Sequence, residues 1–172
     1  MNIDRPIFTE KTKCRDCYKC VRICPVKAIK VENNSAQIIH ENCIFCGRFV
    51  RVCPSEAKKI RNDVPHVKAL ISSGNRVILS VAPSWSSGLF GTSGEMINTF
   101  KQMGFWAVSE TALGAQLVSQ NLADDLNHIE KLVVSSACPV IVELFKKYYP
   151  ENVDSLTPYL SPLGVHTAYL KD

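Results

Sequence analysis

Four cysteines near the start of the chain have a spacing that suits iron–sulfur chemistry. They are Cys14, Cys17, Cys20 and Cys24, followed by Pro25, and they read C-x2-C-x2-C-x3-C-P. In this motif three thiolates bind one four-iron cluster and the fourth binds a second cluster. Zinc sites pair short Cys and His clusters at other spacings, and disulfides are typical of secreted proteins. The spacing therefore predicts 4Fe–4S ligation.

A second copy of the motif begins at Cys43. Cys43, Cys46 and Cys53, followed by Pro54, repeat the first motif, but Phe49 stands where its third cysteine belongs. An internal repeat of this kind predicts a duplicated ferredoxin-type domain with two cluster sites. Phenylalanine cannot bind iron, so the second site has one protein ligand fewer than the first.

The repeat predicts that each cluster takes ligands from both copies. We expect the first 4Fe–4S cluster to be bound by Cys14, Cys17, Cys20 and Cys53. We expect the second, incomplete site to be formed by Cys24, Cys43 and Cys46. Three outcomes stay open for this site: a 3Fe–4S cluster, a 4Fe–4S cluster with water or another ligand on one iron, or no cluster. In the last case Phe49 serves only to pack the core.

The composition is that of a globular protein, with 46% hydrophobic and 21% charged residues. The N-terminal residues lack the apolar core and cleavage site of a signal peptide, and no apolar run has the length of a membrane span. Eight cysteines without a secretion signal indicate metal binding in a reducing compartment. We therefore expect a cytoplasmic protein of an anaerobic or microaerobic cell.

Charge is divided unevenly along the chain. Residues 1–62 hold 13 Lys and Arg against 6 Asp and Glu, a charge of +7, whereas residues 63–172 hold 7 against 10, a charge of −3. Basic residues near iron–sulfur clusters offset the negative charge of the thiolates and of the reduced clusters. The charges lack the interleaved aromatic residues that stack on nucleic-acid bases. We expect a redox-protein donor or acceptor as the partner, and no nucleic acid.

The order of apolar patterns predicts two domains. Between the cysteine motifs, Ile29–Glu32 and Gln37–His40 alternate around Asn33-Asn34, which is typical of a hairpin. Residues 63–75 predict a linker with a short helix. Beyond it, apolar runs predict three buried strands, over residues 76–82, 105–109 and 131–136. Helical spacing predicts three helices, over residues 95–103, 110–121 and 139–148. The fold expected is an α+β ferredoxin-type domain (residues 1–62) followed by an α/β domain with a parallel sheet (residues 76–172).

Short motifs in the second domain resemble those of iron-only (FeFe) hydrogenases. They are Leu79-Ser80-Val81-Ala82-Pro83, Met103-Gly104-Phe105, Ser135-Ser136-Ala137-Cys138-Pro139, Tyr149-Pro150-Glu151, Ser161-Pro162 and Ala168-Tyr169-Leu170-Lys171. With the cysteine motifs, they make the chain similar to the N-terminal part of such a protein. The resemblance implies a dicluster domain followed by an incomplete hydrogenase large-subunit domain. The implied function is the transfer of single electrons through 4Fe–4S clusters.

The resemblance also implies a role for Cys138. In that family the matching cysteine binds the cubane of the H-cluster, the cofactor of hydrogen chemistry. Ala137 stands where catalytic members have a proton-relaying cysteine, which resembles the sensory branch. The family uses four cysteines for this cofactor, and Cys138 is the only cysteine after Cys53, so we expect no H-cluster in this chain alone. Cys138 is then expected to be a small buried residue at a strand–helix corner.

Two alternatives follow from the resemblance, and whether the chain is an enzyme stays open. The chain is a hydrogenase, or it is a hydrogen- or redox-sensing domain partnered by a sensor or kinase module. In both cases the remaining H-cluster ligands lie in further sequence or in another chain.

Overall fold

The computed structural model describes residues 5–87, 91–128 and 131–171. The chain forms two compact units. The cysteine-rich unit consists of Met1–Asn62 and Pro139–Val153, and the α/β unit consists of Asp63–Cys138 and Asp154–Asp172. The chain therefore passes between the units three times. The domain boundaries expected at residues 62 and 75 stay a prediction.

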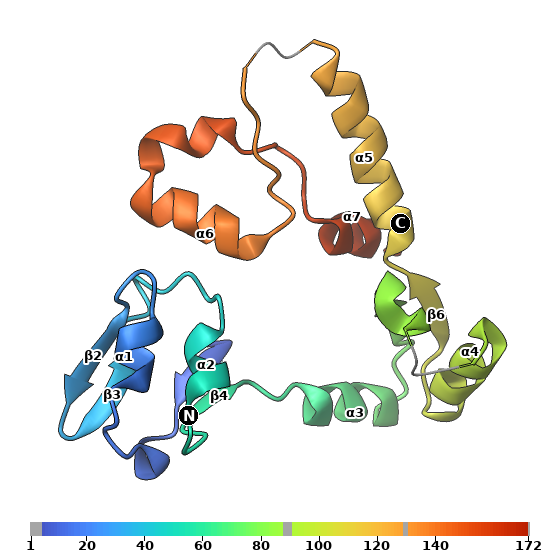
Figure 1. Cartoon of the computed structure of the whole chain (residues 1–172). Helices are drawn as coiled ribbons and strands as arrows, with labels where there is room; N and C mark the ends of the chain where they lie inside the picture. Colours follow the sequence, from blue (N-terminus) through green and yellow to red (C-terminus); the bar gives the residue numbers. More distant parts are fainter. Residues whose placement is uncertain (1–4, 88–90, 129–130, 172) are drawn as a thin grey trace. The chain divides into compact units, whose positions relative to one another are not determined.

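The cysteine-rich unit contains two small antiparallel sheets and two short helices that pack on each other (Figure 1). The first sheet pairs β1 (Ile7–Thr9) with β4 (Lys58–Ile60). The second sheet pairs β2 (Ile29–Glu32) with β3 (Ser35–Ile38). The short helices are α1 (Lys19–Ile23) and α2 (Arg48–Val52), and a 3-10 turn, η1, covers Lys11–Lys13.

The internal repeat extends beyond the cysteine motifs. The residue offset between Cys14 and Cys43 also separates the start of α1 from the start of α2, and the start of β2 from the start of β4. The two sheets share one register as well, because Thr9 lies opposite Lys58 just as Ile38 lies opposite Ile29. The repeated unit therefore starts at β1, before the first cysteine.

The predicted hairpin is present, with its second strand displaced by two residues. Asn33 and Asn34 have φ values of 49° and 56°, as a two-residue hairpin turn of the primed type requires. A turn of two residues places Ser35 directly opposite Glu32. Strand β3 therefore begins at Ser35 and not at Gln37.

The α/β unit is built around a short parallel sheet of β5 (Ile78–Val81) and β6 (Ala107–Glu110). Helix α4 (Ser93–Gln102) connects the two strands, as the predicted strand–helix–strand order requires. A capping box starts this helix, because the Thr92 side chain accepts from the Glu95 N–H and the Glu95 side chain accepts from the Thr92 N–H. The remaining elements of the unit are α3 (Val64–Ser72), η2 (Pro83–Ser86), α5 (Ala112–Leu126) and α7 (Pro162–Tyr169).

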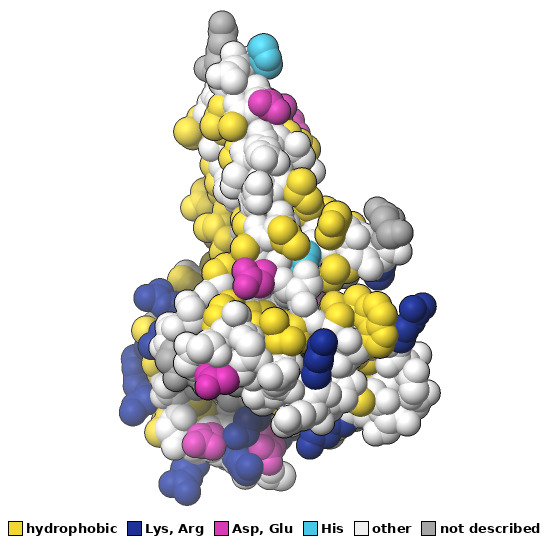
Figure 2. Space-filling view, turned by 90° about the vertical axis from the view of Figure 1, so that its right-hand side faces the viewer, with side chains coloured by type: hydrophobic (Ala, Val, Ile, Leu, Met, Phe, Trp, Pro, Cys, Tyr) yellow, Lys and Arg dark blue, Asp and Glu magenta, His cyan; other side chains and the backbone are white. Residues whose placement is uncertain are grey.

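Helix α5 packs against α7 (Figure 1). Gly114 of α5 leaves no room for a side chain, because a Cβ atom there would overlap the backbone of α7 at Pro162 and His166. Away from this contact α5 is more open, and its Leu113 and Leu117 are exposed. Exposed apolar side chains of the chain are drawn in yellow in Figure 2. No helix in the described part of the chain is long and apolar enough to cross a membrane.

The prediction of a third strand over residues 131–136 is wrong. In the described residues of this segment only Val134 forms a β-bridge, parallel to Leu156. Its N–H donates to the Ser155 carbonyl at 2.7 Å, and its carbonyl accepts from the Thr157 N–H at 2.9 Å. The segment that contains Leu156 is not a strand either, because the 3-10 helix η3 (Pro150–Ser155) ends directly before it. The apolar run therefore has only a one-residue ladder beside it.

Candidate iron–sulfur sites

Three of the four cysteines predicted at the first site gather around the ammonium group of Lys58. The Cys14 Sγ accepts a hydrogen bond from the Ala36 N–H at 3.4 Å, and the Lys58 Nζ donates to the Ala36 carbonyl at 2.6 Å. The charge of Lys58 interacts with the thiols of Cys20, Cys14 and Cys53. These thiols come from both copies of the repeat. Cys17, the fourth predicted ligand, lies in the same loop as Cys14 and is exposed.

The cysteines predicted at the second site form a separate group. The thiol of Cys43 interacts electrostatically with those of Cys24 and Cys46. Cys24 and Cys43 are each 2% exposed, whereas Cys46 is half-buried. Cys24 belongs to the first motif and the other two belong to the second. Cys14, Cys20 and Cys53 thus interact with Lys58, and Cys24 and Cys46 interact with Cys43.

Backbone N–H groups point at several of the sulfur atoms. The Ala28 N–H donates to Cys24 Sγ at 3.2 Å, and the Phe45 N–H donates to Cys43 Sγ at 3.4 Å. In iron–sulfur proteins such hydrogen bonds help to set the reduction potential of the cluster. The donors are part of the loops that carry the motifs, so the same loops both place and polarise the sulfur atoms.

Two cysteines of the first group, Cys14 and Cys53, have environments that favour ionisation. Burial opposes it most strongly, but hydrogen bonds from the Ala36 and Asp16 N–H groups hold the pKa of Cys14 below its ordinary value. At Cys53 burial again works to raise the pKa, but hydrogen bonds, that of the Lys58 N–H foremost, outweigh it and lower the pKa. Iron binds the thiolate form of cysteine, so these environments fit a cluster.

Burial prevails at two other ligands. It raises the pKa of Cys20 and that of Cys43 above their ordinary values, although nearby hydrogen bonds and positive charges work against it. Each of these thiols therefore loses its proton more readily once iron is bound than before, since metal binding releases the proton.

The backbone of the two cysteine loops is itself repeated in an uncommon conformation. Positive φ values occur at equivalent positions of the two copies: Asp16 and Phe45, Tyr18 and Gly47, and Lys27 and Glu56. A non-glycine residue in the left-handed region costs about 1–2 kcal/mol. Five of these six residues are not glycine, so the loops hold a strained path in both copies. Such strain is typical of functional loops, here those that carry the thiols.

Phe49 fills the position that the missing cysteine leaves in the second copy. It is 1% exposed and belongs to the core cluster that also contains Cys20, Cys24 and Cys43. Its ring lies 5.9 Å from the Lys58 Nζ. The second copy therefore has a buried apolar ring where the first copy has the thiol of Cys20.

In the described part of the chain, no three Cys, His, Asp or Glu side chains converge on a single metal-ion position. A cubane does not require this, because each of its thiolates binds a different iron atom. The donor set, the hydrogen bonds to sulfur and the two cysteine groups fit 4Fe–4S chemistry at the first site.

Helix α6 (Pro139–Tyr148), which lies where the sequence predicts it, packs beside the second group. The Lys147 Nζ donates to the Cys43 carbonyl at 2.7 Å and lies 5.0 Å from the Phe45 ring. Lys147 also forms an ion pair with Glu143 at 2.7 Å. The Tyr148 hydroxyl donates to the Asn42 carbonyl at 2.8 Å. These bonds tie α6 to the loop that begins the second motif.

The expectation that Cys138 is a buried residue at a strand–helix corner is wrong. Its side chain is exposed, as is that of Ala137. The segment before it is not a strand either, apart from the single β-bridge at Val134. Cys138 is far from the seven motif cysteines in the sequence, and among the described residues it belongs to no group of side chains that could hold a metal ion.

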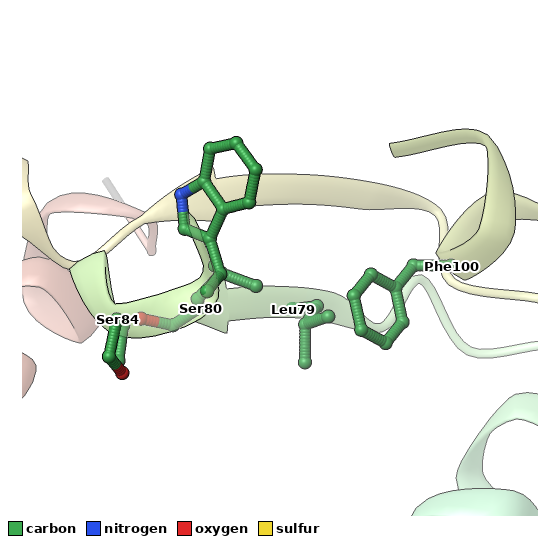
Figure 3. Close-up of a pocket in the computed structure, with 7 residues that line it drawn as sticks. Leu79, Ser80, Ser84 and Phe100 are labelled. Atoms are coloured by element: carbon green, nitrogen blue, oxygen red, sulfur yellow. The ribbon is translucent and has the colours of Figure 1, made fainter. Parts of the chain in front are cut away.

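The α/β unit has a pocket of about 260 Å³ beside β5. In Figure 3, Phe100 lies next to Leu79 at one end, and Ser80 and Ser84 lie toward the other. The seven residues that line the pocket include no ionisable side chain. The pocket therefore has serine hydroxyls in its lining but no acid, base or metal ligand.

The hydroxyl of Ser80 is held by His166, which is fully buried. The Nδ1 atom of His166 lies 2.8 Å from Ser80 Oγ, and its Nε2 atom lies 2.8 Å from Ser109 Oγ. Both ring nitrogens are thus satisfied by hydroxyls on the two strands. This arrangement locks α7 onto the sheet and explains the histidine as a packing residue.

Sequence reasoning missed Lys58 and Lys147. The signal for Lys58 was available, because aligning the two copies of the repeat places it on Ile29, where the hairpin pattern expects an apolar residue. Nothing in the sequence connects Lys147 with Cys43, since 104 residues separate them.

The family comparison agrees with this geometry. A family model of the 4Fe–4S dicluster domain matches residues 6–64. A family model of the iron-only hydrogenase large subunit, C-terminal domain, matches residues 75–172, more than half of the chain. The chain belongs to the iron-only hydrogenase family. The resemblance and the fold class predicted from the sequence are therefore confirmed. No curated protein matches the chain.

Within the iron-only hydrogenase family, this member combines the dicluster domain with a hydrogenase-like domain. The dicluster domain gives it an iron–sulfur, electron-transfer role, and such a role implies redox partners. The assignment of individual cysteines to clusters stays a prediction.

Proposed function

We propose that this protein passes single electrons through a 4Fe–4S cluster bound by Cys14, Cys17, Cys20 and Cys53. The observation that carries the proposal is that Ala36 links Cys14 to Lys58 by two hydrogen bonds, while the charge of Lys58 also interacts with Cys20 and Cys53. Thiols from both copies of the repeat meet there, as crossed ligation requires. When bound, the cluster supplies a one-electron couple. The chain supplies the thiolates, the N–H groups that donate to them, and the nearby positive charge.

The second site, in this proposal, is an altered cluster site. Cys24, Cys43 and Cys46 would provide three thiolates, and the buried Phe49 stands in the sequence where a fourth ligand would come from. Three thiolates suit a 3Fe–4S cluster, and we propose that this is what the site holds.

The proposed partner is an acidic redox protein. Helices α1 and α2 carry exposed basic residues at equivalent places in the two copies: Lys19 and Arg22 in the first, Arg48 and Arg51 in the second. Complementary charge raises association rates between proteins and makes them depend on salt. The transfer rate to an acidic ferredoxin should therefore fall as salt is raised. A rate that is independent of salt would argue against this surface.

A second candidate is a hydrogenase or a hydrogen-sensing role. It is favoured by the family match over residues 75–172 and by the exposure of Cys138. In this role Cys138 binds an H-cluster cubane together with ligands other than the seven motif cysteines. Ala137 has no transferable proton, which favours sensing over fast turnover. Hydrogen uptake after treatment with the maturation proteins tests it.

The main experiment is anaerobic reconstitution of the full chain, followed by iron and sulfide analysis and electron paramagnetic resonance. The expected result is one stable 4Fe–4S cluster at the first site and a three-iron signal from the second. The variant Cys138→Ala serves as a control and should keep both signals. A colourless protein that holds zinc or no iron would refute the proposed function. We also propose that the protein works in a reducing cytoplasm, because oxygen and oxidants attack exposed clusters and thiols.

A further inference from the structure

Lys58 is a buried charge in the core of the cysteine-rich unit. Lys58 is 2% exposed, although lysine is almost never fully buried unless it is paired. It lies in β4, opposite Thr9 of β1, and its Nζ donates to the Thr9 hydroxyl at 2.8 Å. A charge in this place needs a local reason, because burying an ammonium group without compensation is costly.

The equivalent place in the other copy of the repeat is apolar. There Ile29 lies opposite Ile38, and both side chains are buried. The fold therefore does not require a lysine at this position. One copy has an isoleucine pair, and the other has a lysine with a hydroxyl partner.

The neighbours of the Lys58 ammonium identify what compensates its charge. Its hydrogen-bond acceptors are neutral, the Thr9 hydroxyl and the Ala36 carbonyl. The Ala36 N–H in turn donates to the sulfur of Cys14. Burial works to lower the pKa of Lys58, and the thiol groups of Cys20, Cys14 and Cys53 oppose this by favouring its charged form.

The lysine beside the second site is arranged differently. Lys147 forms an ion pair with Glu143 at 2.7 Å, so a carboxylate already balances its charge. The 23% exposure of its side chain also allows water to screen it. The two sites therefore differ in the charge that they experience: a buried cation at the first and a compensated one at the second.

We propose that Lys58 raises the reduction potential of the first cluster. The inference rests on the proposed function, because it assumes the cluster bound by Cys14, Cys17, Cys20 and Cys53. Reduction by one electron from a redox-protein donor adds one negative charge and no atom to the site. The buried ammonium stabilises this added charge, and the low dielectric of the core strengthens the interaction. Net charge near a cluster is one of the factors that set its potential.

The test is a redox titration of the reconstituted full chain, followed by electron paramagnetic resonance. Lys58→Met and Lys58→Gln both remove the charge, and glutamine keeps a hydrogen-bond donor. Lys58→Ile inserts the residue that the fold accepts in the other copy. The matched control is Lys59→Met, which removes the same charge from the next residue, where it pairs with Glu56 on the surface.

We expect the three Lys58 variants to lower the equilibrium constant for reduction of the first cluster at least tenfold, about 59 mV for one electron. Lys59→Met should change it less than threefold. An unchanged potential in the Lys58 variants overturns the proposal. The proposal is also overturned if Lys58→Gln has the wild-type potential while Lys58→Met does not, since hydrogen bonding and not charge would then be responsible.

Iron analysis separates this inference from the proposed function. If the wild-type chain takes up no cluster at the first site, both fail. If the wild type and Lys59→Met hold the cluster but all three Lys58 variants lose it, Lys58 serves assembly and the inference alone is overturned.

Discussion

Phe49 takes in the second copy of the repeat the place that Cys20 takes in the first. Both residues are buried, and both belong to one core cluster. The helices that carry them, α1 and α2, start at equivalent positions of the two copies. The backbone therefore presents a side chain at this point in the same way in both copies, and only the side chain decides whether iron can be bound there.

Replacing this side chain should complete the second site. In Phe49→Cys we expect the three-iron signal to be replaced by that of a second 4Fe–4S cluster, with about one more iron atom per chain. Iron analysis and electron paramagnetic resonance of the reconstituted protein measure both changes. Phe49→Leu, which keeps an apolar residue, should gain no iron. If the wild type already holds two equally stable four-iron clusters, the interpretation of Phe49 is wrong.

Crossed ligation predicts that the last cysteine of each motif serves the other site. Cys53→Ala should abolish the signal of the first cluster, although Cys53 belongs to the second motif. Cys24→Ala should leave that signal intact and remove the signal of the second site, although Cys24 belongs to the same motif as Cys20. The opposite pattern in the two variants would show that each motif binds its own cluster.

Lys147 should hold α6 on the cysteine-rich unit. Lys147→Met removes the bond to the Cys43 carbonyl, and hydrogen bonds from a charged group contribute about 1.5–3 kcal/mol. Amide hydrogen exchange in α6 should therefore become at least tenfold faster. The control is Lys146→Met, which changes an exposed residue of the same type on the same helix. Equal exchange rates in the two variants would exclude this role for Lys147.

Tyr159 provides a pH-dependent contact inside the α/β unit. Its hydroxyl bonds Asp125 of α5, and this bond and the nearby negative charge raise the pKa of Tyr159 above its usual value of about 10. Because the pKa is higher in the folded state, the contact contributes fully to stability below about pH 10 and is lost as the pH rises through the folded-state pKa.

A titration followed by nuclear magnetic resonance of the tyrosine rings measures this shift, with Tyr159→Phe assigning the signal. Asp125→Asn should bring the pKa of Tyr159 down toward its usual value, whereas Asp124→Asn should have a smaller effect. A pKa that stays raised in Asp125→Asn would show that another group is responsible.

Local signals in the sequence were sufficient for α6 and for the turn of the hairpin, but α1, α2 and α7 were not predicted as helices. Proline in the first turn and helical spacing predicted α6 with the bounds that the structure has. The two asparagines predicted the turn of the hairpin, but not that β3 starts directly after it.

Features that depend on distant pairing could not be predicted in this way. The short strand β1 exists because β4 pairs with it, although Thr9 and its partner Lys58 are 49 residues apart in the sequence. The apolar run at residues 131–136 is the converse case, since its pattern is typical of a strand but only Val134 finds a backbone partner among the described residues. The burial of Lys58 likewise depends on β1, which supplies Thr9.

Helix α6 comes from the part of the sequence that the hydrogenase family model matches, yet it folds with the cysteine-rich unit. A single cut after residue 62 would therefore not release two self-sufficient pieces. The N-terminal fragment would lose the helix that bonds the Cys43 carbonyl, and the C-terminal fragment would carry that helix without its hydrogen-bond acceptors. Efforts to transplant this iron–sulfur module should graft residues 139–153 with it.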